Sequence, residues 1–146
     1  MTRVLEFNDV VVRRDGRNIV DHVTWSVSED ERWVILGPNG AGKTTILQLA
    51  DTILHPTSGT VDILGERLGR TDVFELRPRI GIASSAMARR VPGDETVLNT
   101  VLTAAYSVTG RWNEQYDSID ERRASRVLDE WRLSHLAEHY KNMVSE

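Results

Sequence analysis

A run of small residues that ends in a lysine and two threonines carries the clearest chemistry in this chain. The run is Gly37, Pro38, Asn39, Gly40, Ala41, Gly42, Lys43, Thr44 and Thr45, and it fits the pattern G-x-x-x-x-G-K-[ST]. Glycines allow successive backbone N–H groups to turn inward around an anion, and a helix that follows presents its positive end to the same anion. The run therefore predicts a loop that binds the phosphates of a nucleotide.

The three residues after the last glycine have distinct predicted roles. Lys43 reaches the β- and γ-phosphates as a point charge and stabilises them during catalysis, the Thr44 hydroxyl ligates Mg²⁺, and Thr45 donates to the α-phosphate. Only Lys43 and Lys141 are lysines among eighteen basic residues, the rest being arginine. A lysine in so arginine-rich a chain indicates that position 43 needs a compact ammonium rather than a planar guanidinium.

The elements around the loop are the ones that such a loop requires. Residues 33–36 form a short apolar run that predicts a strand buried on both faces, and residues 44–52 have helical spacing. Residues 4–12 and 19–27 flank a turn-like break, which predicts an antiparallel β hairpin, and further strands are predicted at residues 60–64 and 79–83. Because a strand, the loop and a helix follow in this order, a glycine-rich helix cap without a ligand is the weaker interpretation.

In the last third of the chain, the apolar period is that of helices. One predicted helix, with Asp94 as its N-cap, has an apolar face made of Val97, Leu98, Val101, Leu102 and Ala105. The next predicted face is made of Ala124, Val127, Leu128 and Trp131. Ser134 is predicted to cap a last short helix that runs through Tyr140. The change of period predicts a β-rich part with the phosphate loop at residues 1–85 and a partial helical part at residues 86–146.

Composition excludes several classes of function. A net charge of −4 offers no broad basic face, so nucleic acid is not expected as a partner. No apolar run approaches the roughly 18 to 20 residues of a membrane span, so direct membrane insertion is not expected either. The chain has no cysteine, which excludes disulfides, thiolate metal sites and a cysteine nucleophile.

Several segments beyond the loop resemble the ATP-binding cassette (ABC) ATPases, in the same order along the chain. They are VDHVTWSV at residues 20–27, residues 32–45, PTSGTV at residues 56–61, Gly65 and RIGI at residues 79–82. The resemblance implies an α/β fold with a P-loop NTPase core, an N-terminal antiparallel β subdomain and a partial helical subdomain. On this interpretation, residues 1–146 are the N-terminal portion of one ABC ATP-binding domain.

The resemblance also implies a function. Its cofactors are ATP and Mg²⁺, and the implied activity is ATP hydrolysis that drives transport of an unknown substrate. The implied partners are membrane-spanning transporter subunits and a second ATP-binding domain. The implied location is the cytoplasm, at the inner face of the cell membrane through those subunits.

Two positions depart from the family pattern. Arg14 stands where an aromatic ring usually stacks on adenine; its guanidinium could stack on the base, or it is a solvated turn arginine. Ser85 stands where a glutamine usually senses the γ-phosphate and Mg²⁺, and serine copies that reach only through a bridging water. The metal role implied for Ser85 is therefore weak, and coupling to a membrane partner is less secure than nucleotide binding.

The family's later motifs, which include a signature sequence and a catalytic glutamate, are not complete in these residues. Met143, Val144, Ser145 and Glu146 look like the opening of the signature, so the chain is expected to be truncated there. We therefore expect Mg·ATP binding without appreciable turnover. Unpaired strand edges should also favour aggregation or dependence on another chain. The alternatives are a non-transport ABC ATPase, a small phosphate-loop kinase, and a binding fragment that needs a second chain.

Other candidate sites are weaker. Asp129 and Glu130 follow two apolar residues and fall on the outward side of a predicted helix, which indicates a solvated face rather than an acidic catalytic motif. His135 and His139 have helical spacing, but the glutamate of a zinc-binding HExxH motif is missing between them.

Overall fold

The computed structural model describes residues 2–106, 108, 111 and 115–144. The chain divides into two compact units, Met1–Ile80 and Gly81–Glu146. Each unit has its own secondary structure and its own buried residues, and each is described here by itself. The sheet and the phosphate loop belong to the first unit.

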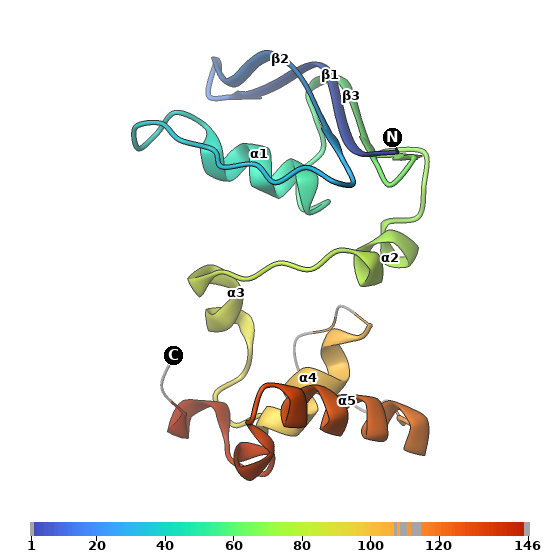
Figure 1. The fold of residues 1–146 in the computed structure, drawn as a ribbon. Helices are drawn as coiled ribbons and strands as arrows, with labels where there is room; N and C mark the ends of the chain where they lie inside the picture. Colours follow the sequence, from blue (N-terminus) through green and yellow to red (C-terminus); the bar gives the residue numbers. More distant parts are fainter. Residues whose placement is uncertain (1, 107, 109–110, 112–114, 145–146) are drawn as a thin grey trace. The chain divides into compact units, whose positions relative to one another are not determined.

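An antiparallel sheet is the largest element of the first unit (Figure 1). Its strands are β1 (Arg3–Arg14), β2 (Arg17–Ser28), β3 (Ser58–Ile63) and β4 (Glu66–Arg67), in the order β2-β1-β3-β4. The predicted hairpin is confirmed as β1 and β2, and the predicted strand at residues 60–64 as β3. Asp15 and Gly16 form the hairpin turn with φ of 50° and 73°, the left-handed backbone that a tight two-residue hairpin needs.

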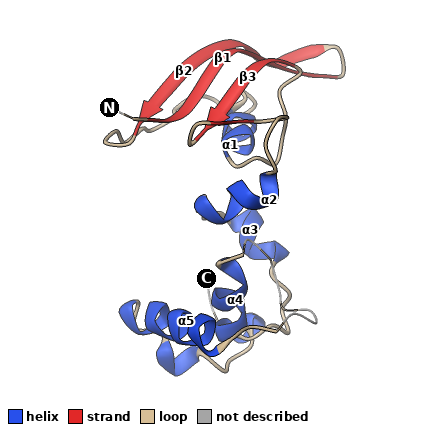
Figure 2. Cartoon of the chain, turned by 90° about the vertical axis from the view of Figure 1, so that its right-hand side faces the viewer, coloured by secondary structure: helices blue, strands red, loops and turns tan. Residues whose placement is uncertain are grey.

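The helix α1 (Lys43–Ala50) lies against the sheet (Figure 2), which confirms the helix predicted after the glycines. Its Leu49 is fully buried and shares a core with apolar residues of β1, β2 and β3: Phe7, Val10, Val12, Val20, Val61 and Ile63. A short helix, α2 (Val73–Leu76), adds the buried Leu76 to the same core. Burial of α1 against the sheet holds the start of this helix, and with it the phosphate loop, in place.

Two predicted strands are wrong. Residues 33–36 form no strand, and their side chains are largely exposed, Val34 at 78% and Leu36 at 87%. Residues 80–83 are also outside any strand, after a 3₁₀ helix at Arg77–Arg79. A strand must pair its backbone N–H and C=O groups with a neighbour, and neither segment has a strand partner in the part of the chain that the structure describes.

The second unit is helical. It contains α3 (Ser85–Arg90), α4 (Val97–Ala104), α5 (Ser118–Glu130) and 3₁₀ helices at Ser134–Leu136 and Lys141–Met143. Leu102 of α4 is buried, as are Ala124 and Leu128 of α5. The burial of these residues confirms the central part of each predicted apolar face.

Three details of the predicted helices are wrong. Thr96 rather than Asp94 caps α4, because its side chain lies next to the first turn and accepts from Asn99 N. Trp131 is 74% exposed, since α5 ends before it. Ser134 caps no helix through Tyr140, since this stretch forms only a 3₁₀ helix that ends at Leu136.

A close contact at Gly59 tests how β3 is held beside β1. Gly59 has φ of +79°, and a Cβ there would lie 2.2 Å from the Asp9 carbonyl oxygen. Gly65 has nearly the same φ, +81°, and nothing within 4 Å of a Cβ. We expect Gly59→Ala to lower the free energy of unfolding by more than about 2 kcal/mol, and Gly65→Ala by about 1 kcal/mol, its backbone cost alone. Chemical denaturation measures both, and equal losses would contradict the packing argument.

A pair of irregular residues in the hairpin predicts a titration. Asp9 and His22 have φ of 51° and 49°, and Asp9 Oδ1 lies 2.6 Å from His22 Nδ1. This hydrogen bond, together with the charge of Asp9, raises the pKa of the exposed His22. The pair should stabilise the hairpin fully below the ordinary histidine pKa, and this contribution should disappear as the pH rises through the raised value. An NMR titration should show the His22 pKa falling in Asp9→Asn and unchanged in Glu29→Gln; an unchanged value in Asp9→Asn would refute the pairing.

Candidate functional site

The start of α1 is built to leave backbone donors free. Gly42 is its N-cap, in the left-handed conformation with φ of 97°, and no side chain caps the helix. The first N–H groups of a helix have no partner within it. An anion at this end would satisfy them and would also interact favourably with the helix dipole.

Gly42 is required for a second reason, which is the close approach of the hairpin. A Cβ at position 42 would lie 2.6 Å from the backbone carbonyl oxygen of Ile19 in β2. A Cβ at Gly40, where φ is +85°, would meet nothing within 4 Å, and one at Gly37 would make only ordinary contacts. The last glycine of the loop therefore allows the loop to pack on β2. Gly40 instead provides a left-handed backbone at a position with open space around it.

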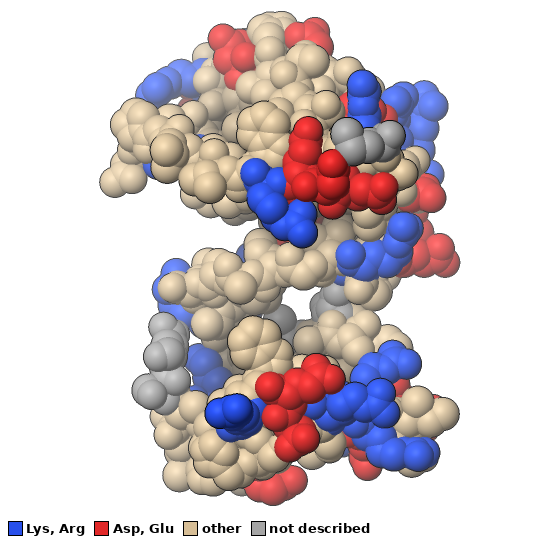
Figure 3. Space-filling model, viewed as in Figure 1, with Lys and Arg blue, Asp and Glu red and all other residues tan. Residues whose placement is uncertain are grey.

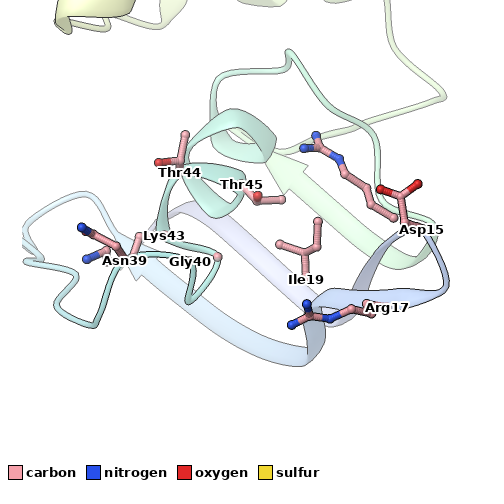
Figure 4. Close-up of a pocket in the computed structure, with 10 residues that line it drawn as sticks. Asp15, Arg17, Ile19, Asn39, Gly40, Lys43, Thr44 and Thr45 are labelled. Carbon is pink, nitrogen blue, oxygen red and sulfur yellow. The ribbon is translucent and has the colours of Figure 1, made fainter.

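The predicted polar side chains of the loop differ in exposure. Lys43 is half-buried and donates through Nζ to the Gly37 carbonyl, so its ammonium lies over the loop. The Thr44 side chain is exposed, whereas Thr45 is buried at 6%. Both threonines lie on the first turn of α1 (Figure 4), where a hydroxyl can reach an anion or its metal ion.

A pocket of about 630 Å³ joins the loop to the hairpin. Six of its lining residues come from the loop and α1, and four come from the hairpin: Arg14, Asp15, Arg17 and Ile19. The side chains of Asp15 and Arg17 extend from the hairpin side in Figure 4, opposite Asn39 and Lys43. The structure thus brings Arg14 together with six of the nine predicted loop residues. Gly37, Pro38 and Ala41 are outside the lining, and Ala41 N donates to the Pro38 carbonyl at 3.2 Å.

Sequence reasoning missed three lining residues, Asp15, Arg17 and Ile19. The Asp-Gly pair between two apolar alternating segments could have predicted them in part. Such a pair is typical of a two-residue hairpin turn, and it would have located the residues on either side of the turn. Whether this turn faces the loop is a tertiary contact that the pattern does not contain.

The charges of the pocket suit a polyanion. Lys43, Arg14 and Arg17 contribute three cations, and Asp15 contributes the one carboxylate among the described lining residues. Elsewhere, basic and acidic side chains are interspersed on the face that Figure 3 shows. The excess of positive charge in the pocket thus contrasts with the chain's net charge of −4.

The donor set also indicates how a metal ion would bind. The described residues contain no group of three or more histidine, cysteine, aspartate or glutamate side chains that could hold one. Mg²⁺ commonly binds through few protein ligands, keeps several waters and takes substrate phosphates as further ligands. The exposed Thr44 hydroxyl fits that mode, in which the metal arrives with the nucleotide.

The remaining predicted residues lie elsewhere. Ser85 is the first residue of α3 in the second unit and is exposed, and the neighbouring Ser84 caps this helix by accepting from Met87 N at 3.0 Å. Asp129 and Glu130 are exposed at the end of α5, which confirms the solvated face. Ser145 and Glu146, predicted to open a signature motif, lie outside the described residues.

Comparisons with known proteins place this pocket in context. The family model for ABC transporters matches residues 20–146. An ABC transporter ATP-binding protein of Streptococcus mutans is 34% identical over 125 residues, which are 86% of this chain and 48% of that protein. The ABC transporter ATP-binding protein YlmA of Bacillus subtilis is 29% identical over 141 residues, 96% of this chain and 53% of that protein. The chain thus spans about half the length of the curated relatives it matches.

Solved structures agree on the fold. The protein cbiO1 from Clostridium perfringens, described as part of the ABC transporter complex cbiONQ, aligns with a TM-score of 0.76 at 21% identity. The alignment covers 99% of this chain and 57% of that one. A similarity at this level of identity establishes the fold, and it confirms the α/β phosphate-loop class predicted from the sequence.

The contact between Gly42 and Ile19 yields a prediction for the loop. We expect Gly42→Ala to push α1 away from β2 and to weaken binding of inorganic triphosphate by about tenfold or more, because a displaced loop no longer aligns its N–H groups. Gly65→Ala is the matched control, since Gly65 has a φ of +81°, open space around a Cβ and a position outside the pocket lining. Isothermal titration of both variants measures the difference, and equal affinities would show that the close approach to the hairpin does not matter for binding.

Proposed function

The chain belongs to the ABC transporter family, and its relatives are ATP-binding proteins of transporters. From that premise we propose that its first unit binds Mg·ATP in the pocket between residues 37–45 and the hairpin turn. One observation carries the proposal: the uncapped N-terminus of α1 opens into a pocket that contains three cations. Both features favour a ligand with several negative charges at one end.

Each loop residue has a proposed role in this complex. Backbone N–H groups of the loop and of the first turn of α1 hold the phosphate oxygens, and Lys43 exchanges its contact with the Gly37 carbonyl for the β- and γ-phosphates. Thr44 ligates the Mg²⁺ that accompanies the nucleotide, and the buried Thr45 donates to the α-phosphate at the pocket wall. Mg²⁺, when bound, neutralises charge on the phosphates. Arg14 lines the far end of the pocket and stacks its guanidinium on the base.

Hydrolysis is proposed for the whole protein, as is general for ABC ATPases, and not for these 146 residues alone. Attack on the γ-phosphate needs a group that orients water near Lys43. The one carboxylate among the described lining residues is Asp15, which lies with the hairpin turn and away from Lys43 in Figure 4. Ser85 could sense the γ-phosphate only through water, and its metal role stays a weak proposal.

The similar proteins support a proposal about partners. These are ATP-binding proteins of transporters, and cbiO1 is part of a transporter complex. We therefore propose that residues 1–146 are part of one ABC ATP-binding domain that pairs with a second such domain and with membrane-spanning subunits at the cytoplasmic face. None of the helices in the described part of the chain could span a membrane.

Replacement of Lys43 tests nucleotide binding directly. We expect Lys43→Ala to weaken Mg·ATP binding by about tenfold or more, since it removes a charge-assisted contact to the phosphates. Lys141→Ala is the control, because Lys141 is the other lysine of the chain and lies in the second unit. Equilibrium titration with a fluorescent ATP analogue measures both affinities. The same affinity in both variants would refute the proposed site.

The limit on turnover has its own test. Phosphate release by the 146-residue chain should not exceed that of its Lys43→Ala variant in a malachite-green assay. A rate clearly above this control would show that the chain carries its own catalytic group, and the assignment of hydrolysis to the whole protein would fall.

A further inference from the structure

The hairpin end of the pocket carries a second inference, which rests on the proposed nucleotide site and concerns its choice of base. We propose that Asp15 reads the edge of the purine, so that the pocket binds Mg·GTP at least as tightly as Mg·ATP.

The position of the base follows from the position of the phosphates. If the triphosphate occupies residues 37–45, the other end of the nucleotide extends along the pocket to the residues that the hairpin contributes. Among the described lining residues there is no aromatic ring, so the base has no aromatic stacking surface. It meets two guanidinium groups and one carboxylate instead: Arg14, Arg17 and Asp15.

The turn holds these groups in a defined place. Arg14 and Arg17 are directly paired across the hairpin, which places both side chains on the same face of the sheet. Asp15 occupies the first turn position with φ of 50°, and Arg13 Nη2 donates to the Gly16 carbonyl at 3.2 Å, which ties the turn to β1. The Asp15 carboxylate accepts no hydrogen bond and forms no ion pair within the described part of the chain. It is therefore available to a ligand.

The two purines differ in what they offer to a carboxylate. Guanine carries two neighbouring donors, N1–H and the 2-amino group, which match the two oxygens of one carboxylate. Adenine has an acceptor, N1, beside its 6-amino group, so it offers one donor and places a lone pair opposite the second oxygen. A carboxylate at this position therefore favours guanine, because every polar group that meets it is satisfied.

The arginines add to the same preference. A guanidinium is planar and can stack on either base, so stacking alone does not discriminate. Its paired N–H groups also match O6 and N7 of guanine, the commonest specific contact of arginine with a base, whereas adenine has an amino group in place of O6. With Asp15 on one edge and an arginine on the other, guanine has partners for N1–H, the 2-amino group, O6 and N7.

The experiment measures affinities of the protein for Mg·GTP, Mg·ITP and Mg·ATP by isothermal titration, before and after Asp15→Asn. Asparagine suits a left-handed turn position before glycine, so this variant keeps the hairpin, and circular dichroism checks that it does. Hypoxanthine, the base of ITP, keeps N1–H and O6 but lacks the 2-amino group. The matched control is Asp30→Asn, an exposed turn aspartate outside the pocket lining.

We expect GTP to bind at least as tightly as ATP, with ITP weaker than GTP. Asp15→Asn should weaken GTP by about tenfold and change ATP by less than about threefold, while Asp30→Asn changes neither. If ATP binds and GTP is weaker by tenfold or more, or if Asp15→Asn leaves the ratio of the two affinities unchanged, the inference about the base is overturned and the ATP site stands. If neither nucleotide binds the unaltered protein, the proposed function itself fails.

Discussion

The contact between the last loop glycine and the hairpin is the constraint on which the pocket depends. Gly42 can lie against the Ile19 carbonyl because it has no Cβ and because glycine adopts its left-handed backbone without strain. The buried Leu49 of α1 holds the helix on the sheet from the other end. The phosphate loop and the hairpin turn thereby belong to one compact unit, Met1–Ile80, and line one pocket.

The chemistry of this pocket is divided along its length. At the loop end, α1 begins without a side-chain cap, so its first N–H groups are left for a ligand, where a serine or aspartate would otherwise occupy them. At the hairpin end, the lining contains the charged side chains of Arg14, Asp15 and Arg17, at or next to the turn. In the proposed complex, the loop end holds phosphate through backbone N–H groups and the hairpin end meets the base through side chains.

The apolar segment at residues 33–36 is largely exposed, unlike the buried face of α1. Its composition is that of a buried strand, yet its side chains are exposed and its backbone has no ladder partner among the described residues. Trp33 illustrates what such a segment does without a sheet: its indole donates to Glu31 Oε2 at 2.8 Å and its ring packs edge-on against Trp25. Burial of a strand is a property of its neighbours, and composition alone does not supply them.

The sequence by itself determined the phosphate loop, the hairpin, α1 and the apolar faces of α4 and α5. These features depend on local rules: glycines that permit a left-handed backbone, an Asp-Gly turn, and apolar residues with the period of a strand or a helix. Arg14 was also predicted as a candidate site residue, although only through the resemblance to the ABC ATPases and not through the residues around it. The sequence did not determine the conformation of residues 33–36, because a strand there depends on a partner distant in sequence. It did not determine the cap of α4 either, because several nearby polar groups compete for that position.

Only the tertiary structure decided that Asp15 and Arg17 share a pocket with the loop. Asp15 and Arg17 lie more than a full strand away from Lys43 along the chain, and they line the same pocket because Gly42 packs on Ile19, two residues after Arg17. A contact of this kind depends on how two elements pack, and packing is set by the shape of a core that many residues build together. Periodicity and motif spacing describe each element alone, so they predicted the groups that we propose to bind phosphate but not those that we propose to face the base.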